Sequence, residues 1–237
     1  MSYSSELHTP LDQPGRLLVV SPHFDDGVFG AGGLLGGRPG SRLLTVFGAA
    51  PKDAELCTDW DRRSGFANSV EAVAARRAED EQAARALGAE VEWLDFLDSQ
   101  YGAPPHADVI AAALARVIDA GDFTIVAFPL GLFHSDHELV REACLTILDG
   151  WPDIAWLGYE DALYRRIAGV VQAALAEFAT RGLVATPVWP QPAGAAEAKQ
   201  IAVGAYESQL VAFDPAALPD LGAPERYWLI TPGADDE

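Results

Sequence analysis

The chain has 237 residues, of which 49% are hydrophobic and 9% aromatic, a composition typical of a globular protein with its own buried core. Its 35 acidic and 16 basic residues give a formal net charge of −19 at pH 7, which disfavours nucleic acids and anionic membrane surfaces as partners. No segment approaches the run of about 18 apolar residues that a membrane span requires, and residues 1–15 lack the pattern of a signal peptide.

The two cysteines, Cys57 and Cys144, are far apart in the sequence and form no C-x-x-C pair. A disulfide framework and a cysteine zinc site are therefore both disfavoured. Together with the absence of a leader pattern, this leads us to expect a cytoplasmic protein with reduced thiols.

Strand and helix patterns alternate from the start of the chain. Residues 16–20 (RLLVV) predict a buried strand, which a glycine-rich turn and the segment 28–35 follow. Residues 43–47 (LLTVF) predict a second strand. Residues 70–87 predict a long helix, and Gly88 stands where its C-terminal stop is expected.

The alternation continues through the middle of the chain. Residues 90–94 predict a third strand and residues 107–120 a helix. A fourth strand is expected at residues 124–128 (TIVAF), then a helix from about 136 to 148 and a short strand at 154–157. This order predicts an α/β fold, a Rossmann-like domain whose mostly parallel sheet carries helices on both faces.

The pattern is less regular in the last third. Residues 170–180 predict a helix, 183–189 an extended segment, and 195–209 the last helix. No repeat or long linker divides the chain, so we expect one domain over residues 1–237, with 1–15 as a flexible N-terminal segment. The connection 49–69 is too long for a simple turn, and loops of that length are usually functional or mobile.

Two polar clusters follow predicted strands. The first, Ser21-Pro22-His23-Phe24-Asp25-Asp26, comes directly after the first strand. The second, His134-Ser135-Asp136-His137, comes shortly after the TIVAF strand. Ligands of open α/β sheets bind outside the carboxyl ends of the strands, so the clusters form one site if the two strands are neighbours.

The second cluster also carries a helix start signal. Ser135 and Glu138 fit a capping box, which predicts Ser135 as the N-cap and places His137 in the first turn.

Imidazole and carboxylate groups are suitable ligands for zinc, and catalytic zinc commonly uses three protein ligands and one water. Five candidate groups leave two for acid–base and oxyanion roles, as a hydrolase requires. Each cluster also has a purely structural interpretation. An Asp-Asp pair can serve a helix N-terminus, and an H-x-x-H pair can lie on the surface. The glycines at 30–33 resemble part of a dinucleotide-binding turn but lack G-x-G-x-x-G.

At these residues the sequence resembles the LmbE-like, or PIG-L, family of zinc-dependent deacetylases, which carries P-H-x-D-D-E and H-P-D-H signatures. The matching segments here are 22–27 (PHFDDG) and 134–137 (HSDH). The likeness extends to a helix pattern and to a late K…Y-x-S-Q segment, at Arg76, Glu79, Ala83, Leu87, Gly88, Lys199, Tyr206, Ser208 and Gln209.

The resemblance implies hydrolysis of an N-acyl group, usually acetyl on an amino sugar or a similar small molecule, by a zinc-held water. Zn²⁺, or another divalent metal, would be bound by His23, Asp26 and His137. The resemblance further implies that Asp25 is the general base and that His134 polarises the carbonyl and stabilises the oxyanion.

Substrate contacts are expected chiefly from four residues, and Arg62, Arg63 and Tyr164 are further candidates for the pocket. Arg76 corresponds to a family arginine near the substrate pocket, although a surface charge on a helix is an equal interpretation. Trp60 stands in the W-D-x-x-x-G-F segment, and Tyr159 and Glu160 begin the Y-E-D-x-x-Y segment of one branch of the family.

Two departures from the family signatures stand out. Gly27 replaces the usual Glu, which predicts the loss of a carboxylate that supports the metal ligands. Ser135 replaces Pro, which a helix start tolerates.

Three other functions remain open. The first is an amidase for a larger conjugate, and the second is a catalytically silent module that binds metal or sugar. The third is a nucleotide-binding Rossmann protein. The substrate would in each enzymatic case be a small molecule, and assembly into a homo-oligomer is compatible with the sequence.

Overall fold

The computed structural model describes residues 15–189 and 195–233. One sheet of seven strands forms the centre of this part, in the order β3-β2-β1-β4-β5-β7-β6. The strands are β1 (Arg16–Ser21), β2 (Arg42–Thr45), β3 (Glu90–Trp93), β4 (Phe123–Pro129), β5 (Ala155–Tyr159), β6 (Leu183–Val188) and β7 (Tyr227–Pro232). The first five pair in parallel, and β7 pairs antiparallel with both β5 and β6.

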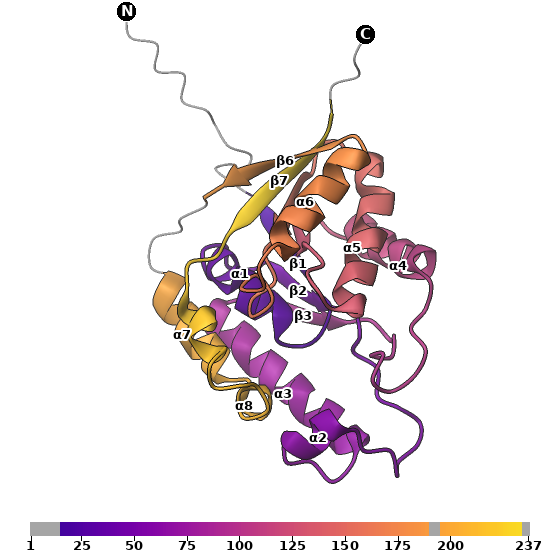
Figure 1. The fold of residues 1–237 in the computed structure, drawn as a ribbon, viewed down its shortest axis with the longest axis vertical. Coiled ribbons are helices and arrows are strands. Elements are labelled where there is room, and N and C mark those ends of the chain that lie inside the picture. The colour runs from indigo at the N-terminus through magenta and orange to yellow at the C-terminus, as the bar shows by residue number, and fades with distance from the viewer. Residues whose placement is uncertain (1–14, 190–194, 234–237) are drawn as a thin grey trace, which may run out of the picture.

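The five parallel strands lie within one or two residues of the segments that the apolar runs predict, and the expected α/β class with a mostly parallel sheet is confirmed. Strand β7 has no counterpart in the prediction. It lies between β5 and β6, so the last strand of the chain is inside the sheet and β6 forms the edge beyond it (Figure 1).

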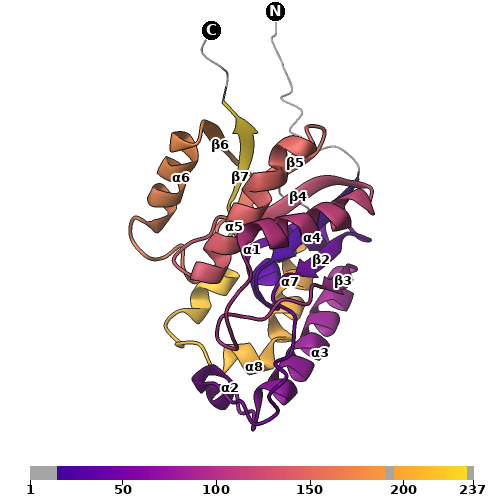
Figure 2. The same ribbon diagram turned by 90° about the vertical axis from the view of Figure 1, so that its right-hand side faces the viewer.

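Helices cover both faces of the sheet. Helices α1 (Asp26–Gly36), α3 (Ser69–Leu87) and α7 (Ala195–Gly204) pack over one core cluster, and α4 (Ala107–Asp119), α5 (Ser135–Ile147) and α6 (Val170–Thr180) over the other. Figures 1 and 2 show these two groups on opposite sides of the strands. Since β1 and β4 are buried on both faces, their continuous apolar runs have the pattern expected of central parallel strands.

The long helix α3 has the ends that its sequence encodes. The Asn68 side chain accepts a hydrogen bond from the backbone N–H of Glu71. At the other end Gly88 has a φ of 65°, the left-handed conformation that glycine adopts without strain. The expected stop at Gly88 is confirmed.

The predicted last helix is two helices. Helix α7 ends at Gly204, and the four-residue helix α8 (Glu207–Leu210) follows after a break. The buried Tyr206 lies in the break, where its hydroxyl donates a 2.7 Å hydrogen bond to Asp80 of α3. The backbone at Tyr206 is not helical, since its φ and ψ are −86° and 54°, and α7 and α8 are therefore not continuous.

The segment 49–69 is an ordered connection that contains the short helix α2 (Asp59–Arg63). Thr58 and Asp61 form a capping box at its start. The remaining helical turns, η2 (Leu148–Gly150) and η3 (Leu218–Gly222), are of the 3-10 type.

The flexible segment expected at residues 1–15 lies outside the described residues, apart from Gly15. Cys57 and Cys144 are both free. Within the described ranges, no helix has both the length and the apolar character that a membrane crossing needs.

Candidate functional site

The two sequence clusters meet at the carboxyl edge of the sheet. Strands β1 and β4 are hydrogen-bonded neighbours, so the turn after Ser21 lies beside the loop after Pro129. The rings of His23 and His134 are 5.2 Å apart, and those of His23 and His137 are 5.3 Å apart. The expected single site is therefore formed, although its halves are more than a hundred residues apart in the chain.

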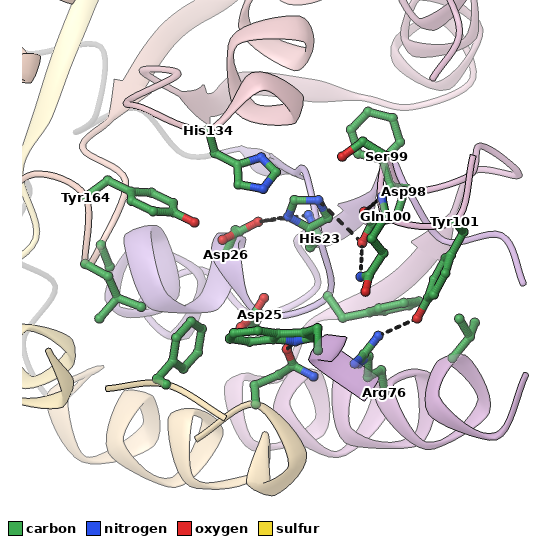
Figure 3. A pocket seen from close by; sticks show the side chains of 18 residues that line it. His23, Asp25, Asp26, Arg76, Asp98, Ser99, Gln100, Tyr101, His134 and Tyr164 are labelled. Atoms are coloured by element: carbon green, nitrogen blue, oxygen red, sulfur yellow. Dashed lines mark hydrogen bonds and ion pairs between the residues drawn. The ribbon is translucent and has the colours of Figure 1, made fainter. Parts of the chain in front are cut away.

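A cavity of about 420 Å³ opens over this edge (Figure 3). Its volume lies in the range of pockets for small molecules. Its polar side contains His23, Asp25, Asp26, Asp98, Ser99, Gln100 and His134. Its aromatic and apolar lining consists of Phe24, Phe47, Trp60, Val73, Leu163 and Phe213 together with Ala162.

Three side-chain atoms converge below the polar side of the cavity. Asp26 Oδ2 lies 2.9 Å from His23 Nδ1 and 3.1 Å from His137 Nε2. These three groups place their ligand atoms within 4.8 Å of one another. Two imidazole nitrogens and one carboxylate oxygen form a donor set that suits zinc, and three protein ligands are the usual number in a catalytic site.

The other nitrogen of each imidazole faces a second carboxylate. His23 Nε2 lies 3.1 Å from Asp136 Oδ2, and His137 Nδ1 lies 2.5 Å from Asp161 Oδ1. Such carboxylates fix the tautomer of a metal-binding histidine and raise its basicity. Both histidines of the donor set therefore have the carboxylate partner that is common for histidine ligands of a metal.

Gly27 brings no carboxylate to the site, and the space around it is small. A Cβ atom at position 27 would lie 2.8 Å from Leu43 Cδ1 and 2.9 Å from Ser21 Cβ, so a larger side chain does not fit here without a shift. The two histidines nevertheless keep carboxylate partners of their own, Asp136 and Asp161.

Asp25 and Asp26 are adjacent but have different surroundings. Asp26 Oδ2 also accepts a hydrogen bond from the backbone N–H of His23, which fixes it among the ligand atoms. Asp25 lines the cavity, and its carboxylate does not cap helix α1. Burial, and then the charge of Asp26, raises the pKa of Asp25 to about 7. A carboxylate with that pKa is suited to accept a proton near neutral pH.

His134, rather than the predicted Ser135, is the N-cap of α5. Its Nδ1 accepts a hydrogen bond of 3.2 Å from the backbone N–H of Asp136. Because Nδ1 is the acceptor, the hydrogen of the neutral ring is on Nε2. Burial, and then the neighbouring His23 and His137, lowers the pKa of His134. The ring is thus a neutral donor on the wall of the cavity.

Two predicted substrate-binding residues are in the cavity wall. The Arg76 guanidinium donates to Asp61 Oδ1 at 3.0 Å and to the Tyr101 hydroxyl at 2.7 Å, so its charge is already paired (Figure 3). Trp60 is held by a hydrogen bond of 2.9 Å from its indole N–H to Gln209 Oε1.

The other two predicted residues do not line this cavity. Tyr159 is fully buried in β5, and its hydroxyl donates to the carbonyl of Val20. Glu160 is also buried and accepts a hydrogen bond from the indole N–H of Trp228. Both side chains are occupied by the protein itself, which corrects the expectation that they contact a substrate.

Several residues of the site carry no role in the sequence interpretation. Asp161 follows Glu160 directly, and Asp136 lies between the two histidines of its cluster. Asp98, Ser99 and Gln100 come shortly after β3, at the same edge of the sheet as the clusters. A polar run after a parallel strand is the signal that could have identified them.

The fold and the donor set define an α/β protein with a candidate metal centre at the carboxyl edge of its sheet. Residues 18–148 match the PIG-L family, described as GlcNAc-PI de-N-acetylase. The chain belongs to this family, which confirms the resemblance seen in the two signatures.

The chain also resembles individual deacetylases. A 2′-N-acetylparomamine deacetylase of Streptomyces fradiae is 35% identical over 192 residues, which cover 72% of this chain. The same alignment covers 65% of that relative, slightly less than two thirds of its length.

Solved structures show the same fold. A teicoplanin-pathway deacetylase in its bog complex aligns with a TM-score of 0.77 and 25% identity, over 93% of this chain and 100% of that one. The A40926 pseudoaglycone deacetylase aligns with a TM-score of 0.74 and 24% identity, over 94% of this chain and 100% of that one.

Proposed function

We propose that this chain is a metal-dependent hydrolase that removes an N-acyl group, in the first instance acetyl, from an amino sugar or a similar small molecule. One observation carries the proposal. Three metal-ligand atoms, from His23, Asp26 and His137, converge beside a separate cavity carboxylate, Asp25, whose pKa is raised to about 7. Membership of a family described as de-N-acetylases supports it.

The metal would be held by His23 Nδ1, Asp26 Oδ2 and His137 Nε2, and Zn²⁺ suits this donor set best. A bound divalent ion supplies Lewis acidity toward the amide carbonyl and lowers the pKa of a water.

The residues of the chain supply the proton transfers. Asp25 accepts a proton from the water as its oxygen attacks the acyl carbon. His134 donates a hydrogen bond from its Nε2–H to the acyl oxygen as negative charge develops there, and keeps its proton. Asp25 then returns the proton to the amine nitrogen as the C–N bond breaks. The products are a carboxylic acid and a free amine, and no other co-reactant is consumed.

The charges of the cavity favour a substrate with further amino groups. Asp25, Asp26 and Asp98 line it, whereas the charge of its one arginine, Arg76, is paired with Asp61. A negatively charged cavity attracts cations, and the net charge of −19 on the whole chain also attracts them. The relative from Streptomyces fradiae, whose name specifies an acetylated paromamine, agrees with an amino sugar substrate.

A product assay tests the proposal. The zinc-loaded chain is incubated with N-acetylglucosamine, N,N′-diacetylchitobiose and 2′-N-acetylparomamine, and both acetate and free amine are quantified. Equal amounts of the two products, highest with the cationic substrate and lost in Asp25→Asn, are expected.

Two other results would replace the proposal. Release of a larger acid from acyl conjugates, without release of acetate, would indicate an amidase for larger substrates. Stable zinc binding without any turnover across the panel would indicate a silent binding module.

A further inference from the structure

One tyrosine hydroxyl points into the cavity and has no hydrogen-bond partner among the described residues. Tyr164 lines the cavity, and Figure 3 shows its hydroxyl turned toward the space between Asp26 and His134. No residue in the described ranges accepts a hydrogen bond from this hydroxyl. A half-buried phenol normally finds an acceptor, so the site leaves this donor available for a ligand.

The other described tyrosines show the usual arrangement. Their hydroxyl groups donate to a carboxylate or a backbone carbonyl, and the pairs are Tyr101 with Asp61, Tyr159 with Val20, Tyr206 with Asp80 and Tyr227 with Glu225. Tyr164 is the exception among the five, and it is the one directed at the candidate metal ligands.

The backbone before Tyr164 is strained. Leu163 has a φ of 72° and Phe133 a φ of 69°, the two non-glycine residues with positive φ in the described chain. Each of them directly precedes a cavity residue, Tyr164 and His134 respectively. Bulky side chains rarely adopt this conformation, and strain of this kind concentrates at functional sites.

Surrounding contacts keep both strained segments in place. The backbone N–H of Leu163 donates a 2.7 Å hydrogen bond to Asp220. The rings of Phe133 and Tyr164 pack together with centroids 5.6 Å apart. The Tyr164 ring also lies 6.1 Å from that of His134 and 5.4 Å from that of His137. The two strained turns therefore hold two hydrogen-bond donors on the same part of the cavity.

The phenol keeps its hydrogen at neutral pH. Burial, and then the negative charges of Asp26 and Asp25, raises the pKa of Tyr164 above its ordinary value. A neutral O–H beside several carboxylates is a donor, and its preferred acceptor is an oxygen that gains negative charge.

We propose that Tyr164 is a catalytic residue, whose O–H donates a hydrogen bond to the acyl oxygen together with His134 Nε2–H as that oxygen becomes negative. This proposal rests on the proposed function, because it needs an amide carbonyl in the cavity. No proton is transferred from Tyr164, and its hydrogen bond to the acyl oxygen is strongest in the transition state.

The test compares two substitutions that each remove one phenol oxygen, Tyr164→Phe and Tyr159→Phe. The zinc-loaded variants are assayed for kcat and KM on the best N-acetyl substrate, for zinc content and for Tm. For Tyr164→Phe we expect kcat to fall about 10²-fold, the scale of one oxyanion donor, with KM and zinc content unchanged. For Tyr159→Phe we expect a lower Tm and an unchanged kcat, since its hydroxyl bonds the Val20 carbonyl away from the cavity.

Three outcomes would overturn the proposal. An unchanged kcat in Tyr164→Phe, while the parent turns over, refutes it and leaves the proposed function intact. A rise in KM alone would make Tyr164 a ground-state contact to the substrate. If the parent deacylates nothing, the proposed function fails and the role of Tyr164 fails with it.

Discussion

The two ring nitrogens of His137 each face a carboxylate. His137 Nδ1 lies 2.5 Å from Asp161 Oδ1, and His137 Nε2 faces Asp26. Asp161 also accepts a hydrogen bond from the backbone N–H of Leu132, so the carboxylate ties the end of β5 to the loop before the second histidine cluster. This contact fixes the tautomer of His137 that leaves Nε2 free to bind a metal.

Replacing Asp161 should therefore weaken metal binding without removing a metal ligand. We expect Asp161→Asn to lower zinc affinity by about 10- to 100-fold, as for other partners of metal-binding histidines. Competition with a chelator measures it. Asp122→Asn is a suitable control, because Asp122 lies just before β4, at the opposite edge of the sheet, and pairs there with Arg16. Equal affinities in Asp161→Asn and the parent would contradict the assignment.

Zinc binding should release protons at neutral pH. Burial lowers the pKa of His137, but Asp26 and Asp161 outweigh it and raise this pKa to about 9. The pKa of His23 is also raised, because Asp98, Asp136 and Asp26 outweigh its burial. A ligand imidazole must be neutral, so binding at pH 7 should release up to about two protons and strengthen as pH rises. Calorimetry in buffers of different ionisation enthalpy counts these protons, and none released would refute this.

The two adjacent aspartates should separate turnover from metal binding. Asp25→Asn removes the proton acceptor with little change of shape, so it should retain zinc and lose about 10²–10⁴-fold in kcat. Asp26→Asn should instead lose much of its zinc. Metal content and amine release for each protein are the measurements. Parental turnover in Asp25→Asn would exclude it as the general base.

His134 should act through its donor hydrogen. We expect His134→Ala to retain zinc and lose about 10²–10³-fold in kcat. His134→Gln offers an amide N–H instead and should recover part of that loss. If the two variants are equally impaired although both fold and bind zinc, a simple donor role fails.

Asp80 should make stability depend on pH. It is buried and accepts hydrogen bonds from Tyr206, Trp93 and Thr45. Burial nevertheless raises its pKa to about 7, against about 3.9 in the unfolded chain. The folded state therefore binds more protons between these values. The stabilisation of the folded state by protonated Asp80 is fully present below about pH 4 and is lost as pH rises through about 7.

The slope of this loss is at most about 1.4 kcal/mol per pH unit. Urea unfolding of the metal-free protein between about pH 5 and pH 8 measures it. Asp80→Asn should flatten the curve, and the difference between parent and variant removes the effects of the other titrating groups. Parallel curves would show that Asp80 does not titrate in this range.

Much of the fold could be predicted from the sequence, because central parallel strands are apolar on both faces. Residues 124–128 (TIVAF), for example, form a short, mostly apolar and β-branched run, which is the pattern of a buried strand. Strand β7 was missed because it is an antiparallel addition far along the chain, and its place in the sheet depends on tertiary pairing. The break at Tyr206 was missed because a hydrogen bond to Asp80 on another helix decides it.

Part of the site could likewise be predicted from the sequence, and part could not. The two signatures, each of which follows a strand, lead directly to His23, Asp25, Asp26, His134 and His137 of the candidate site. The segment Tyr159-Glu160-Asp161 also attracted attention, but the sequence could not show which of the three faces the site. Successive side chains at a strand end point in different directions, and Asp161, just beyond the end of β5, is the one that contacts His137.

The residues that line the cavity come from two parts of the chain, one inside the segment that matches the family and one after it. Residues 18–148, the family match, contain His23, Asp25, Asp26, His134 and His137. The cavity wall also includes Gln209 and Phe213, which come from the C-terminal third. Substitutions there can alter which molecules enter the cavity while the metal ligands stay as they are. A chimera designed to exchange selectivity between relatives should therefore be joined after Tyr164, so that Asp161 stays with the histidine it supports.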